Sequence, residues 1–96
     1  MPEKRGKVAG THNTHRLMFY GLSTCVWCKR TRKFLEEHDV ALEFVYVDLL
    51  EGKEKDAVKA EMCQYNPKES FPTLVIDGSR CVVGYKPNEI KKALEL

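Results

Sequence analysis

Residues 17–28 read LMFYGLSTCVWC, an apolar run that closes on glycine and leads through a short polar loop into two cysteines. The apolar run indicates a buried strand, and apolar residues at helical spacing follow the cysteines. Cys25 and Cys28 therefore fall where a strand turns into a helix. Zinc binding, a structural disulfide and reversible redox chemistry all use two cysteines at this spacing, so the surrounding sequence has to decide between them.

The position of the pair at the start of a helix favours redox chemistry. Unpartnered backbone N–H groups and the positive end of the helix dipole stabilise negative charge there. The thiolate is the reactive form of cysteine, so Cys25 is the candidate nucleophile. Cys28 lies one helical turn further on the same face, where its sulfur can close a disulfide with Cys25. We therefore expect Cys25 to attack a substrate disulfide and Cys28 to release the reduced product.

The other two cysteines argue against zinc. Zinc sites commonly take four ligands as two close pairs, whereas Cys63 and Cys81 stand alone in the sequence. No metal site is therefore predicted. Two disulfides in a secreted protein are another use of four cysteines, but the N-terminus lacks the apolar stretch of a secretory signal. We expect a cytoplasmic protein in a reducing environment.

Composition indicates one globular domain with a basic segment before it. The 96 residues are 43% apolar and 31% charged, and no apolar run approaches the ~20 residues that cross a membrane. Residues 1–16 carry four basic side chains and one acidic one. We expect residues 1–16 to form a flexible basic tail and residues 17–96 to form the domain. Four charges without aromatic residues do not predict nucleic-acid binding.

The pattern of apolar residues predicts the order β-α-β-α-β-β-α. Strands are expected over 16–21, 42–48, 73–76 and 81–83, and helices over 29–38, 51–65 and from Pro87 onward. The first two strands are joined through a helix and should be parallel with a right-handed crossover. Asp77 and Gly78 indicate a hairpin between the last two strands. The expected architecture is a four-stranded mixed sheet flanked by helices.

Three pieces of sequence occur in an order that resembles the glutaredoxin family of the thioredoxin fold. The first is the stretch 17–28 with its cysteine pair. The second is Phe71-Pro72-Thr73, which stands where the family carries a cis-proline before the third strand. The third is the segment 83–89 (VGYKPNE), which matches the glycine turn before the last helix. The resemblance covers residues 17–94.

This resemblance implies a dithiol thiol–disulfide oxidoreductase that reduces protein disulfides, with Cys25 and Cys28 as its catalytic residues. It implies that Pro72 lies opposite Cys25 and that a groove binds the substrate or thiol donor. The groove residues would be Trp27, Phe71, Pro72, Gly84, Tyr85 and Lys86. The protein is expected to be a monomer that needs no cofactor beyond its thiol donor.

The sequence leaves the electron donor open between glutathione, another small thiol and a thioredoxin reductase. Val26-Trp27 replaces the Pro-Tyr that the family often carries, and Leu22 stands where many glutathione-using members have lysine. The segment 84–89 also resembles redoxins that a thioredoxin reductase recycles, and glutaredoxin-like proteins of methanogenic archaea work with another small thiol. A different class of function is also open, in which Cys25 holds a [2Fe–2S] cluster shared between two chains, as in some glutaredoxins.

Overall fold

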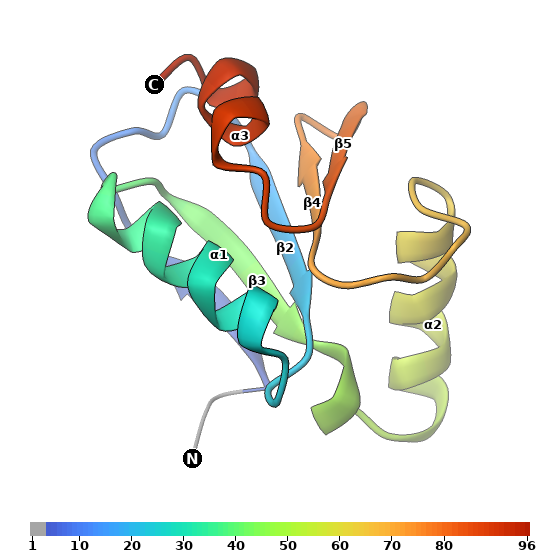
Figure 1. The fold of residues 1–96 in the computed structure, drawn as a ribbon. Helices are drawn as coiled ribbons and strands as arrows, with labels where there is room; N and C mark the ends of the chain where they lie inside the picture. Colours follow the sequence, from blue (N-terminus) through green and yellow to red (C-terminus); the bar gives the residue numbers. More distant parts are fainter. Residues whose placement is uncertain (1–3) are drawn as a thin grey trace.

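A computed structural model describes residues 4–96 and shows a mixed sheet between helices (Figure 1). The five strands of this sheet lie in the order β1-β3-β2-β4-β5. The elements along the chain are β1 (Arg5–Val8), β2 (Leu17–Gly21), α1 (Val26–Glu37), β3 (Leu42–Tyr46), the 3-10 turn η1 (Val47–Leu49), α2 (Gly52–Cys63), β4 (Thr73–Ile76), β5 (Arg80–Val83) and α3 (Pro87–Leu94).

The strand directions follow from the connections between them. β2 and β3 are joined through α1 and pair in parallel, with Gly21 opposite Tyr46 at their carboxyl ends. β4 runs antiparallel to β2 on its other side and turns at Asp77-Gly78 into β5. The order and directions predicted from the sequence over residues 17–96 are thus confirmed.

The two faces of the sheet carry separate apolar cores. On one face α1 and α3 cover the side chains of Leu17, Phe19 and Leu74. On the opposite face α2 covers Tyr20 and Val45, together with Val75. Figure 1 shows α1 and α3 on the near side and α2 set apart beyond the sheet. Because successive strand residues point to opposite faces, the apolar run of β2 supplies both cores and holds this strand at the centre.

The predicted four-stranded sheet is corrected to five strands, because β1 pairs antiparallel with the outer edge of β3. Further along, His12 forms a bridge with Val40. Gly10 permits this close approach, since a Cβ there would lie 2.5 Å from the Asp39 carbonyl oxygen. The expected flexible tail is therefore wrong for residues 4–16, which pack on the domain. Residues 1–3 of that predicted tail lie outside the described part of the chain.

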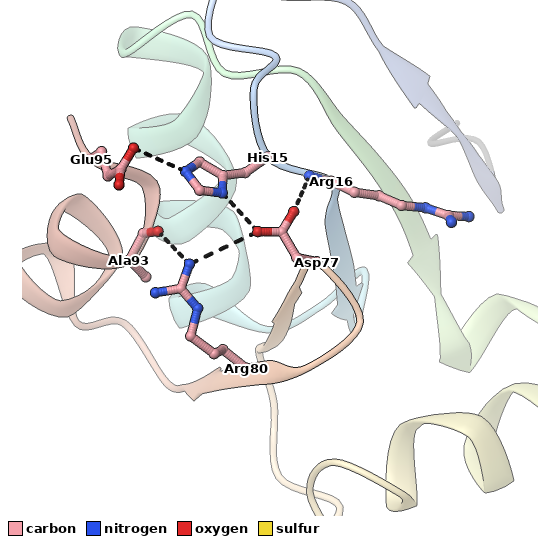
Figure 2. Close-up of polar contacts among 6 residues, drawn as sticks. All are labelled: His15, Arg16, Asp77, Arg80, Ala93 and Glu95. Atoms are coloured by element: carbon pink, nitrogen blue, oxygen red, sulfur yellow. Dashed lines mark hydrogen bonds and ion pairs between the residues drawn. The ribbon is translucent and has the colours of Figure 1, made fainter.

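A polar cluster anchors the end of this N-terminal segment, as Figure 2 shows. The His15 ring contacts Asp77 through Nδ1 at 2.7 Å and Glu95 through Nε2 at 3.4 Å. The backbone N–H of Arg16 donates to the other Asp77 oxygen at 2.8 Å. Arg80 lies 3.9 Å from Asp77 and also donates to a carbonyl near the end of α3. The cluster ties the start of β2 to the β4–β5 turn and to the C-terminus.

The His15–Asp77 contact predicts a pH-dependent contribution to stability. The hydrogen bond with Asp77 raises the pKa of His15 above 6.5, and the same bond lowers the pKa of Asp77. Because the pKa of His15 is raised on folding, the contact stabilises the folded chain at pH values below the histidine pKa of the unfolded chain. This stabilisation is lost as pH rises through the pKa of His15 in the folded chain. Because the pKa of Asp77 is lowered on folding, its contribution to stability is lost as pH falls through the pKa of Asp77 in the folded chain. The contact is therefore strongest at about pH 5–6.

We expect His15→Gln to lower the free energy of unfolding more at pH 5.5 than at pH 8.5, as measured by urea denaturation. His12→Gln is the matched control, because His12 joins its neighbours through backbone hydrogen bonds. An equal loss of stability at both pH values in His15→Gln would contradict the assignment.

Candidate thiol redox site

Cys25 is the residue that caps the N-terminus of α1. Its backbone is extended (φ −82°, ψ 120°), and its Sγ accepts the backbone N–H of Cys28 at 3.3 Å. The sulfur thus occupies the position that serine or aspartate oxygens take at other helix starts. Its side chain is only partly buried. A negative charge on this sulfur would be stabilised by the helix dipole and by the N–H it already accepts.

Cys28 lies one turn behind Cys25 in a different environment. Its side chain is buried, with 1% of its surface exposed, and its Sγ accepts the backbone N–H of Leu22 at 3.5 Å. Burial is the main cause that raises the pKa of Cys28 to about 12, and the hydrogen bond with Cys25 adds to it. The Leu22 N–H acts in the opposite direction. The pair therefore combines an accessible thiol with a buried, protonated one.

The segment before β4 contains the cis-proline that the sequence predicted. The peptide bond between Phe71 and Pro72 is cis. The carbonyl of Pro72 accepts the N–H of Gly84 at 2.8 Å, which continues the β4–β5 ladder by one step. Gly84 has φ +86°, in the left-handed region that favours glycine. Phe71, Pro72 and Gly84 thus lie together at the end of the β4–β5 hairpin.

Trp27, Arg30 and Tyr85 form a surface that we call the aromatic shelf. The rings of Trp27 and Tyr85 stack with their centroids 6.2 Å apart and their planes 25° apart. The Arg30 guanidinium lies 5.1 Å from the centre of the Trp27 ring, an attractive cation–π arrangement. Trp27 and the adjacent Val26 are 54% and 58% exposed. The fold therefore places a large apolar surface within two residues of Cys25.

Lys86, Cys63 and Cys81 lie away from the Cys25–Cys28 pair in the sequence. Lys86 caps the start of α3 beside Tyr85, and its Nζ lies 3.9 Å from Glu89 in an exposed ion pair. Cys63 ends α2 and Cys81 lies in β5. All four cysteines are free, and residues 4–96 hold no group of three or more side chains suited to a metal ion. The structure thus does not gather the four cysteines at one site.

One contact at the site was not expected from the sequence. The backbone N–H of Ser23 donates to Oδ1 of Asp48 at 2.9 Å, and the Ser23 hydroxyl donates to Oδ2. Asp48 lies 23 residues beyond Cys25 and belongs to no motif with it. The only sequence signal that bears on it is the predicted parallel pairing of the first two strands, which brings together the residues that follow each strand; the register, with Gly21 opposite Tyr46, is visible only in the structure.

Comparison with known proteins identifies the family. The model of the glutaredoxin family matches residues 17–81. The chain belongs to the glutaredoxin family. The glutaredoxin from Methanosarcina mazei Go1 is 41% identical, with a TM-score of 0.90 over 98% of this chain and 90% of that one. The methanoredoxin of Methanosarcina acetivorans is 40% identical, with a TM-score of 0.91 over 97% and 98% of the two chains.

A curated relative supports the same family. A glutaredoxin-like 8.6 kDa protein in the rubredoxin operon of Clostridium pasteurianum is 29% identical over 79 residues, which are 82% of this chain and 97% of the relative. The thioredoxin-like fold class expected from the sequence is confirmed. Within residues 4–96, no helix is long and apolar enough to span a membrane. The family and the adjacent Cys25 and Cys28 together support a thiol redox function.

The unequal burial of the two thiols predicts unequal alkylation in this glutaredoxin. We expect iodoacetamide to modify Cys25 in the folded, reduced chain at neutral pH while Cys28 stays unmodified. Because the pKa of Cys28 is raised to about 12, its modification should begin only in strongly alkaline solution. Peptide mass spectrometry at several pH values measures both rates. The urea-unfolded chain is the control and should lose the difference, and equal rates in the folded chain would contradict this arrangement.

Proposed function

We propose that this glutaredoxin reduces protein disulfides by dithiol exchange between Cys25 and Cys28. The observation that carries the proposal is the placement of the two sulfurs. The Cys25 Sγ caps a helix, accepts the Cys28 N–H and is accessible, whereas the Cys28 sulfur is buried one turn behind it. This reaction needs a nucleophile that meets the substrate. It also needs a second thiol, shielded from the substrate, that can attack the sulfur of the nucleophile.

The reaction proceeds in two exchange steps. The Cys25 thiolate attacks one sulfur of the substrate disulfide, the substrate S–S bond breaks, and the other sulfur leaves as a thiolate that takes up a proton. Cys28 then loses its proton and attacks the Cys25 Sγ. The mixed disulfide breaks, the second substrate thiol leaves, and an internal Cys25–Cys28 disulfide forms. Two electrons from a donor restore both protein thiols.

The substrate is proposed to bind across the aromatic shelf and the end of the β4–β5 hairpin. Trp27 offers exposed ring surface beside Cys25 and stacks on the partly buried ring of Tyr85, and Lys86 adds positive charge next to Tyr85. By the family resemblance, Phe71 and Pro72, with Gly84, form the opposite wall of this groove. Arg30 and its exposed neighbours Lys29 and Lys33 make the helix surface positive, which favours substrates with acidic residues near the disulfide.

We propose a low-molecular-weight thiol as the electron donor. Two observations bear on its identity. Leu22 occupies the position where many glutathione-using members carry lysine, which removes a partner for a glutathione carboxylate. The resemblance to glutaredoxin-like proteins of methanogenic archaea implies a small thiol other than glutathione, and the chain is 40% identical to the methanoredoxin of M. acetivorans. Thioredoxin reductase is the other donor to be compared. The protein is proposed to act as a cytoplasmic monomer.

The roles of the two cysteines are tested by single substitutions in an insulin-reduction assay. We expect Cys25→Ser to reduce turnover to the uncatalysed rate, because the attacking sulfur is lost. Cys28→Ser should instead accumulate a mixed disulfide with the substrate, visible by non-reducing electrophoresis. Cys63→Ser is the matched control and should keep the parent activity. Parent-level turnover in Cys25→Ser would reject the proposal.

The electron donor is identified by repeating the assay with glutathione, with 2-mercaptoethanol as a second small thiol, and with NADPH and a thioredoxin reductase. We expect turnover with the second small thiol to exceed that with glutathione.

Anaerobic purification and gel filtration test the alternative function, a [2Fe–2S] cluster shared between two chains. A brown dimer without reductase activity would indicate a [2Fe–2S] carrier and would overturn the proposed reaction.

A further inference from the structure

The contact between Asp48 and Ser23 joins the loop after β2 to the 3-10 turn η1, which follows β3. Because Gly21 and Tyr46 are paired across the parallel strands, the residues two positions further along each chain lie side by side. Ser23 donates both its backbone N–H, at 2.9 Å, and its hydroxyl to the two oxygens of Asp48. A carboxylate that accepts two hydrogen bonds from one residue fixes both the position and the orientation of that residue.

The loop that Asp48 holds is in contact with the Cys28 thiol and with the backbone N–H of Cys25. Leu22, directly before Ser23, donates its N–H to the Cys28 Sγ at 3.5 Å. The carbonyl of Leu22 accepts the N–H of Cys25 at 3.2 Å. Both peptide groups that flank Leu22 are therefore used at the site, and their direction depends on where Ser23 is held.

We propose that Asp48 is a positioning residue of the redox pair, which acts through Ser23 to keep the Leu22 N–H directed at the Cys28 Sγ while Cys28 attacks the mixed disulfide. The proposal rests on the proposed dithiol function. Cys28 must form a thiolate in a buried site, where a hydrogen-bond donor that is already in place stabilises the charge. The Leu22 N–H is such a donor, and it favours the thiolate of Cys28 against the effect of burial.

The negative charge of Asp48 acts against ionisation of Cys28, whereas its hydrogen bonds with Ser23 are proposed to favour it. Substitutions can therefore separate the effect of the charge from the effect of positioning. The carboxylate opposes ionisation of Cys28, so removing only its charge should help the attack. Asp48→Asn removes the charge and keeps an oxygen that can accept the Ser23 N–H. Asp48→Ala removes the charge and the acceptor together. Positioning therefore predicts a slow Asp48→Ala variant and an Asp48→Asn variant that is not slowed.

The experiment uses the full chain with Cys63→Ser and Cys81→Ser, so that the redox pair alone reacts. The reduced protein is mixed with 5,5′-dithiobis(2-nitrobenzoate), and the coloured aromatic thiolate is followed by stopped flow. Attack by Cys25 breaks the reagent disulfide and releases the first aromatic thiolate. Attack by the Cys28 thiolate on the Cys25 Sγ releases the second and leaves an internal disulfide. The rate of the second release measures the step that Asp48 is proposed to assist.

We expect Asp48→Ala to slow the second release about tenfold, the size of effect expected when a hydrogen bond to a charged group is lost. Asp48→Asn should react at the parent rate or faster, and Ser23→Ala, which keeps the backbone donor, should be slowed about threefold. Glu51→Gln is the matched control, because it removes an acidic charge three residues away whose side chain makes no capping hydrogen bond. It should react at the parent rate.

A parent-rate second release in Asp48→Ala would overturn the proposal, and so would an Asp48→Asn variant as slow as Asp48→Ala. If circular dichroism shows that Asp48→Ala does not fold, Ser23→Ala decides in its place, and its reaction at the parent rate would overturn the proposal. Failure of the proposed function has a different signature. In that case the parent chain itself would keep aromatic thiols bound to both cysteines, as mass spectrometry would show.

Discussion

The hydrogen bond from the Cys28 N–H to the Cys25 Sγ is the contact on which the chemistry proposed for this glutaredoxin depends. It exists only because α1 begins at Val26, so that the sulfur of the preceding residue lies at the helix start. The same geometry makes the two thiols different. The capping sulfur remains accessible, while the residue three positions later turns inward and is buried.

The rest of the fold keeps that helix start at the edge of the central strands. β2 lies between β3 and β4 and contributes side chains to the cores on both faces of the sheet. The short loop from Gly21 to Cys25 therefore leaves a strand that is fixed from both sides. On one side the loop is tied to Asp48 in η1, which directly follows β3. The position of the sulfur is thus set by the sheet, and not by the helix alone.

The features that could be predicted from sequence are those that depend on neighbouring residues. The cysteine pair and the order of elements over 17–94 follow from local spacing, although α1 begins at Val26, three residues before the predicted start. β1 was missed because its four residues, RGKV, include a single large apolar side chain, and its pairing with β3 is made by backbone groups. The contact of Asp48 with Ser23 was missed because it depends on strand register, which no local pattern records.

Val26-Trp27 stands where the glutaredoxin family often carries Pro-Tyr. Val26 is the first residue of α1, a position where proline is tolerated because the N–H group there has no partner within the helix. Valine therefore begins the helix as a proline could, and it adds one backbone N–H in the residue that follows Cys25. Trp27 projects outward and stacks on Tyr85. The chain thus has one more backbone N–H at the helix start than a proline would supply, and an exposed aromatic side chain stacked on Tyr85.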